Sequence, residues 1–176
     1  VKGSSSDCSG YVVIPSGVTS IWPNAFKNRS GITSVIITDS VTSIGPTAFY
    51  NTPNLRSVEI GNGVTSIGEL AFGETPSLIN LTLGNSVTTI GPSAFANTGL
   101  RSVTIPDSVT SIGANAFFFA ISMISLTIGN SVTYIGSGAF QYAQLTSLRI
   151  PNSVTNLGSR TFQSLPQDLT TYTYCG

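Results

Sequence analysis

The sequence predicts a repeat solenoid, an elongated domain in which copies of one short unit stack on each other. Each copy repeats one apolar spacing, which in the fifth copy is Leu100, Val103 and Ile105 followed by Val109 and Ile112. Turn-forming Pro, Gly, Asn and Asp residues fall at fixed offsets between these positions. An Ala-Phe pair, Thr-Phe in the last copy, recurs at steps of 22 or 23 residues, with its phenylalanines at Phe26, Phe49, Phe72, Phe95, Phe117, Phe140 and Phe162. A unit this short cannot bury its own apolar face, so the copies must stack.

A period of this length is typical of the leucine-rich-repeat solenoid. We expect about seven coils of 22–24 residues over residues 9–168, an N-terminal lead-in at 1–8 and a C-terminal capping strand at 169–176. Because the repeat runs from end to end, the chain is expected to form one domain without an internal boundary.

Each coil contains the same series of predicted elements. Val103, Thr104 and Ile105 alternate apolar and polar, as in a strand with one buried face, and the stacked strands should form a parallel β-sheet on the concave side. Residues 109–112 predict a second short extended piece on the convex side. The Gly-Pro pair at Gly45-Pro46 then suits the start of a short helical turn, which leads to the phenylalanine.

Composition narrows the class of function. Only 8% of the residues are charged, with seven basic and seven acidic side chains, so the chain has no basic field for nucleic acid or for an acidic membrane surface. No apolar run is long enough to insert into a membrane. The chain has no histidine and its carboxylates are scattered, so no catalytic, metal or cofactor site is predicted. Where carboxylates share a column, at Asp39 and Asp107, we expect bonds to the local backbone rather than a calcium ladder.

The two cysteines, Cys8 and Cys175, fall at opposite ends of the predicted stack. A disulfide requires Cα atoms within about 7 Å, and the stack would hold the ends several times farther apart. We therefore expect no bond between them within one chain. Each cysteine is free, paired with another molecule or paired with a cysteine outside this sequence.

The repeated string V-T-x-I-G, followed by A-F, resembles the BspA-like, treponemal-type leucine-rich repeats of bacterial surface proteins. The resemblance covers residues 9–168 and implies protein binding or adhesion and an extracellular or cell-surface location. The sequence differs from this family three positions after each phenylalanine, where cysteine is common. This chain has Arg29, Thr52, Thr75, Thr98, Ala120, Ala143 and Leu165 there.

The first candidate binding site is the pair Phe118 and Phe119, together with Tyr142 one coil away. The repeat places mostly small or polar residues at these positions, so the three rings predict an exposed aromatic patch of the kind that anchors a partner. The competing interpretation is that one ring folds back against Ile121 and Met123.

The second candidate is the outer face of the predicted sheet. Its side chains are mostly small, and the larger polar ones that could anchor a partner are Arg56, Glu59, Arg101 and Arg149. Ordinary variation of a solvated surface explains the same residues.

A column of threonine suggests an alternative function. Regular hydroxyl and methyl groups on a stiff, weakly charged solenoid are what an ice-binding surface needs, by resemblance to solenoidal antifreeze proteins. Thr also suits an extended, partly exposed position on propensity alone. The column comprises Thr19, Thr42, Thr65, Thr88, Thr110, Thr133 and Thr155. The sequence as a whole favours a non-catalytic recognition, adhesion or scaffold module whose partner is another protein or a cell-surface macromolecule.

Overall fold

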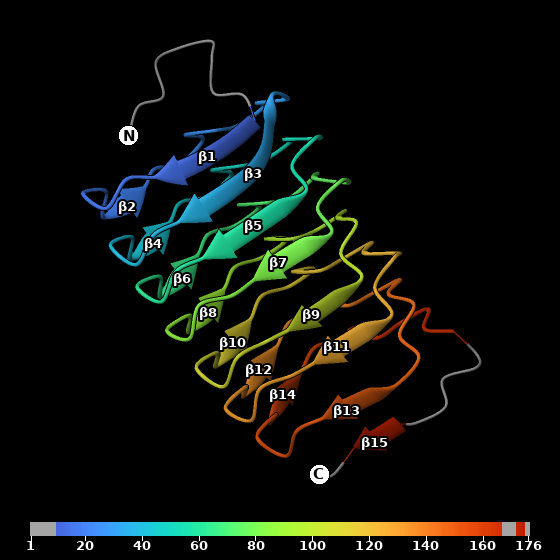
Figure 1. Cartoon of the computed structure of the whole chain (residues 1–176). Coiled ribbons are helices and arrows are strands. Elements are labelled where there is room, and N and C mark those ends of the chain that lie inside the picture. The colour runs from blue at the N-terminus through green and yellow to red at the C-terminus, as the bar shows by residue number, and fades with distance from the viewer. Residues whose placement is uncertain (1–9, 167–171, 175–176) are drawn as a thin grey trace.

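The computed structural model describes residues 10–166 and the backbone of residues 172–174. The chain forms a parallel β-solenoid of about six turns, and no helix occurs within these ranges. Successive coils stack from β1 to β15, with longer strands on one face and two-residue strands beside them (Figure 1). The leucine-rich-repeat class is therefore confirmed.

The longer strands lie in parallel register, but their ladder is interrupted twice. The first four, β1 (Gly10–Ile14), β3 (Ile32–Ile37), β5 (Ser57–Ile60) and β7 (Asn80–Thr82), form one sheet. The next pair is β9 (Ser102–Thr104) with β11 (Ser125–Thr127). The last pair is β13 (Leu148–Ile150) with β15 (Tyr172–Tyr174). We call this side of the solenoid the long-strand face.

The short strands form one continuous parallel sheet of seven. In spatial order they are β2 (Ser20–Ile21), β4 (Ser43–Ile44), β6 (Ser66–Ile67), β8 (Thr89–Ile90), β10 (Ser111–Ile112), β12 (Tyr134–Ile135) and β14 (Asn156–Leu157). Seven equivalent strands are separated by about six turns of chain. The prediction of about seven coils is therefore wrong by one, because it counted the phenylalanines rather than the turns between them.

The predicted helical turns on the convex side are also wrong. After Gly45 the chain forms a series of turns in which Thr47 and Asn51 both have a φ of 54°, in the left-handed region. Alternate amides therefore point in different directions. The Ala48 N–H donates to the Gly45 carbonyl three residues back, whereas the Phe49 N–H donates to Ala71 in the next coil at 2.7 Å. A helix would need every amide for its own ladder, so the Pro at this position begins a turn and not a helix.

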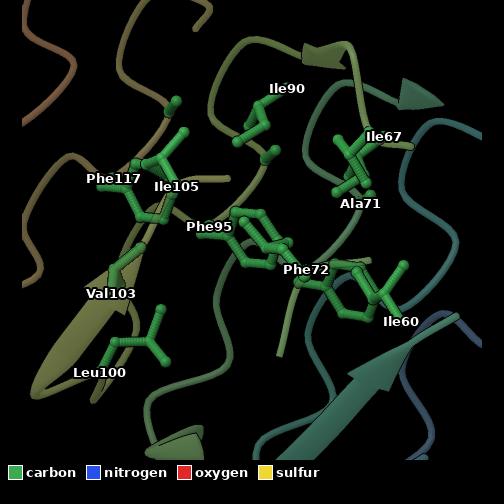
Figure 2. Close-up of a cluster of buried hydrophobic side chains, with 14 of the residues drawn as sticks. Ile60, Ile67, Ala71, Phe72, Ile90, Phe95, Leu100, Val103, Ile105 and Phe117 are labelled. Carbon is green, nitrogen blue, oxygen red and sulfur yellow. The ribbon is translucent and has the colours of Figure 1, made fainter. Parts of the chain in front are cut away.

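The phenylalanine column forms the centre of the core, as predicted. Neighbouring rings stack with centroids 4.9 to 5.6 Å apart and planes within 11° of parallel. Figure 2 shows Phe72, Phe95 and Phe117 in one buried cluster with isoleucines of the two strand rows. These are Ile60 at the end of β5 and Ile105 directly after β9, together with Ile67 and Ile90 from the short strands. The rings from Phe26 to Phe140 are buried and Phe162 is half-buried.

The residues that replace the family's cysteines satisfy buried carbonyls. The hydroxyls of Thr52, Thr75 and Thr98 are buried and donate to the carbonyls of the phenylalanines three residues earlier, at 2.8, 2.6 and 3.1 Å. In the two coils that have Ala120 and Ala143 instead, the small side chains are also fully buried. The core thus accepts either a hydroxyl that bonds back or a methyl group.

The predicted boundaries at 1–8 and 169–176 remain predictions. β15 lies within the second range and its backbone pairs in parallel with β13, from Leu148 opposite Tyr172 to Ile150 opposite Tyr174. Cys8 and Cys175 are outside the described residues, so the expectation that they do not pair also remains a prediction.

Candidate interaction surface

The three aromatic residues predicted from the sequence come together at one corner of the solenoid. Tyr142 meets Phe118 and Phe119 edge to face, with 5.6 Å between ring centroids in both pairs, and the two phenylalanines lie 6.0 Å apart. Phe118 is half-buried, whereas Phe119 is 42% exposed and Tyr142 is 36% exposed. We call Phe118, Phe119 and Tyr142 the aromatic cluster.

The competing interpretation, in which one ring folds back against Ile121 and Met123, remains a prediction for Phe118, which is half-buried. Met123 is fully buried, whereas Ile121 is 54% exposed. Ile124, two residues before the middle of β11, is also exposed. The aromatic cluster therefore lies in a part of the chain that is rich in exposed apolar side chains.

The backbone under two of these rings has an unusual conformation. Phe119 and Tyr142 have φ values of 59° and 68°, in the left-handed region. Every coil adopts this conformation here, because the residue begins the turn back toward the long-strand face. In other coils the position is held by Asn28, Asn51, Glu74, Asn97 and Ser164, all with positive φ. Asn tolerates this region well, but a bulky side chain there is an outlier.

Polar residues at this position form hydrogen bonds between coils. The Asn51 side-chain amide donates to the Asn28 side-chain oxygen at 2.9 Å, and the Asn97 amide donates to a Glu74 carboxylate oxygen at 2.6 Å. Phe119 and Tyr142 can form neither bond. The two aromatic residues thus replace a side-chain ladder that suits the backbone, in adjacent coils.

Sequence reasoning found the rings but missed the backbone conformation. A signal was available, because Asn recurs two residues after the phenylalanine in the first, second and fourth coils. Asn repeated at one turn position indicates positive φ.

The predicted residues of the long-strand face are exposed but do not form one cluster. Glu59 is on β5 and Arg149 is on β13, four coils away, which corresponds to about 19 Å at the usual strand spacing. Arg56 and Arg101 are two coils apart, about 10 Å, with the exposed Ile79 between them. Within residues 10–166 neither guanidinium forms an ion pair.

The threonine column has a structural explanation. Each hydroxyl from the second coil onward donates to the carbonyl of the threonine in the preceding coil, at 3.0 to 3.3 Å. The backbone amides of the same residues donate to the same carbonyls. The hydroxyl protons are therefore used within the stack, which explains the column without any external ligand.

The shared Asp and Asn turn positions bond the next coil rather than the local backbone. An Asp39 carboxylate oxygen accepts from the Asn62 N–H at 2.6 Å, and an Asp107 oxygen accepts from the Asn130 N–H at 2.7 Å. The expectation of bonds to the local backbone was therefore wrong, because the partner of each carboxylate is a backbone amide of the next coil. No group of potential metal ligands occurs among the described side chains, and none of the described residues forms a helix long and apolar enough to cross a membrane.

The geometry defines the class of protein: a parallel solenoid of short coils whose side chains mostly hold neighbouring coils together. The sequence profile described as BspA type leucine rich repeat region matches residues 5–122 and 115–174, in six copies. The chain belongs to this family, and the predicted resemblance is confirmed. Its members are typically non-enzymatic surface repeat proteins, and leucine-rich repeats generally mediate protein interactions.

Solved structures show the same fold. A leucine rich cell surface protein from Faecalibacterium prausnitzii is 35% identical with a TM-score of 0.78, over 86% of this chain and 44% of that one. A leucine-rich repeat protein from Treponema pallidum is 26% identical with a TM-score of 0.72, and the match covers 84% of this chain and 68% of that one. A leucine-rich repeat protein from Bacteroides ovatus is 24% identical with a TM-score of 0.65, and the match covers 86% of this chain and 54% of that one. This chain thus spans about half the length of the first and third. No curated protein sequence matches it.

Proposed function

We propose that this chain is a non-catalytic recognition module that docks another protein through the aromatic cluster. The observation that carries the proposal is the conformation of Phe119 and Tyr142, two bulky residues in the left-handed region with their rings partly in solvent. Such a conformation costs on the order of 1–3 kcal/mol per residue. Stability alone does not favour it, because Asn fits the same position and bonds the neighbouring coil.

The arrangement of the rings suits a contact surface. Tyr and Phe contribute large apolar area with few rotatable bonds, and aromatic residues are enriched at the centres of interfaces. The three rings hold each other edge to face, so little side-chain freedom remains to be lost on binding. Ile121 and Ile124, which follow Phe119 in the chain, are also exposed apolar side chains.

A cell-surface location is part of the proposal. The Faecalibacterium relative is described as a cell surface protein, and it shares 35% identity with this chain. A surface adhesion or scaffold role is consistent with the family. We do not propose ice binding, because the hydroxyls of the threonine column are already used between coils.

The proposal is tested with peptides selected on the wild-type chain from a displayed random library. Each selected peptide is then titrated against the double variant Phe119→Asn with Tyr142→Asn, which restores the residue type that other coils have. We expect the affinity to fall about 30-fold or more, equivalent to the 2 kcal/mol that marks a hot spot. The Phe118→Ser with Phe119→Ser variant should weaken the same peptides.

The matched control changes the long-strand face instead. Arg56→Ser with Arg101→Ser removes two exposed side chains of similar size without altering the aromatic cluster. Peptides that bind the cluster should keep their affinity for this variant. If every selected peptide binds the Asn double variant as well as it binds the wild type, the aromatic cluster is not the contact surface.

A further inference from the structure

The two interruptions of the long-strand ladder coincide with two short connections. Four connections place the next core residue six positions after the phenylalanine, as from Phe72 to Leu78. Leu100 follows Phe95 by only five positions, and Leu145 follows Phe140 by five. These two connections lead into β9 and β13, and the ladder is missing between β7 and β9 and between β11 and β13. Each connection that is shorter by one residue thus leads into a break of the strand ladder, although at the second break the Thr146 N–H still donates to the Ile124 carbonyl at 3.2 Å.

The interruption before β9 uncovers part of the core. Leu81, in the middle of β7, is half-buried, whereas Val35, Val58, Val103 and Leu148 at the same position of their strands are at most 2% exposed. Val12, in the first strand β1, is also half-buried. At the second interruption the equivalent residue, Leu126, is only 8% exposed. The opening is thus much wider between β7 and β9. The short strands on the other side, β8 and β10, still pair at this level, so the opening is confined to the long-strand face.

The opening is a shallow groove of about 820 Å³, lined by residues of 79–85 and 101–106. It follows the strand direction for about five residues, or roughly 16 Å. Ile79, Leu81 and Pro106 supply an apolar lining, and Arg101 is its one charged residue. The Arg101 guanidinium forms no ion pair with any described residue, and Arg56 provides a second unpaired guanidinium on the other side of Ile79.

We propose that this groove is a second binding site, which takes an extended peptide segment that carries a carboxylate between apolar side chains. The site is separate from the aromatic cluster and from the function proposed for it. The apolar side chains of the peptide would cover Leu81 and Ile79, and its carboxylate would pair with Arg101. Arg is well suited to this role because its planar guanidinium binds a carboxylate through two parallel hydrogen bonds.

The shape of the groove favours an extended segment over a helix. An α-helix is about 10 Å across, which is wider than the usual spacing of the neighbouring strands that line the groove. An extended segment can instead lie along the groove, over Ile79 and Leu81. The charge favours an acid, because neither Arg56 nor Arg101 forms an ion pair with a described residue and no acidic residue is among those that line the groove.

The probe is the blocked pentapeptide acetyl-Val-Asp-Val-Thr-Val-amide, compared with the same peptide carrying Asn in place of Asp. Titration into the ¹⁵N-labelled full chain should move the amide signals of residues 79–83 and 101–105 most. We expect the Asp peptide to bind at least about tenfold more tightly than the Asn peptide, and Arg101→Gln to remove this preference.

A repaired connection gives a variant with a matched control. Inserting one Pro after Thr98 recreates the Thr-Pro-x-Leu sequence of Thr52 to Leu55 and Thr75 to Leu78, which should restore the ladder and close the groove. Binding of the Asp peptide should fall about tenfold or more. Inserting one Pro after Ala143 repairs the other connection in the same way and should leave binding unchanged.

The possible results separate this proposal from the preceding one. The Phe119→Asn with Tyr142→Asn variant should bind the Asp peptide like the wild type; loss of binding there would assign the peptide to the aromatic cluster and overturn the groove site. The groove site would also be overturned if the wild type showed no saturable binding at peptide concentrations up to about 1 mM, the range of weak affinities. Equal binding of the Asp and Asn peptides would overturn it as well. Arg101→Gln decides the question should either insertion fail to fold.

Discussion

Replacing Phe95 by Ala tests whether the ring column is the main source of stability. Phe95 is fully buried and stacks on Phe72 at 5.3 Å and on Phe117 at 5.2 Å. Loss of about 150 Å² of buried apolar surface at 25 cal/mol per Å² corresponds to ~4 kcal/mol. Measured Phe-to-Ala changes in cores cover ~3–5 kcal/mol, and the two lost stacking contacts favour the upper half of that range.

Phe162 provides the matched comparison within the same column. It is half-buried and stacks only on Phe140 among the described rings, at 5.6 Å. We expect Phe162→Ala to lower the free energy of unfolding by ~1–2 kcal/mol, less than half the effect at Phe95. Urea denaturation followed by circular dichroism measures both values. Equal effects at the two positions, or a loss below ~2 kcal/mol at Phe95, would refute the view that stacking continuity determines stability.

Two further pairs of substitutions, each with its own control, test how neighbouring residues and coils are joined. Thr75→Val removes the hydroxyl that donates to the Phe72 carbonyl at 2.6 Å in a fully buried site. Because this carbonyl is left without a partner, we expect the free energy of unfolding, measured by urea denaturation, to fall by ~1–3 kcal/mol. Thr133→Val, at an exposed site, should lower it by less than ~1 kcal/mol. Gly84→Ala would place a methyl group 2.2 Å from the Gly61 carbonyl oxygen in the preceding coil, so we expect a loss of several kcal/mol or failure to fold, whereas Gly17→Ala, with no atom within 4 Å, should be nearly neutral in melting temperature.

The sequence predicted those parts of the fold in which one side chain determines one contact. The phenylalanine column and the Val and Ile positions could be found because burial recurs at a fixed period. The turn after Gly45 was mistaken for a helical turn because Pro begins both structures, and the difference lies in the positive φ of Thr47 and Asn51.

The candidate sites were only partly predictable. Phe118, Phe119 and Tyr142 stood out as departures from the repeat, and the structure brings them together. The groove beside Arg101 was missed, although the five-residue step from Phe95 to Leu100 is visible in the sequence. The effect of a missing residue on a ladder depends on the backbone path between coils, which the residue types do not specify.

The most direct test of the proposed function is the melting temperature of the Phe119→Asn with Tyr142→Asn variant. The substitutions remove the backbone strain of two aromatic residues in the left-handed region, ~1 kcal/mol each. This gain should offset the loss of the ring contacts, ~1–2 kcal/mol in total, so the melting temperature should be unchanged or higher. The reverse change, Asn51→Tyr, should lower stability by ~1–2 kcal/mol. If the double variant instead melts at a lower temperature, by roughly the 2–4 °C that ~1 kcal/mol represents in a chain of this length, the rings stabilise the fold and their exposure is no evidence of a partner.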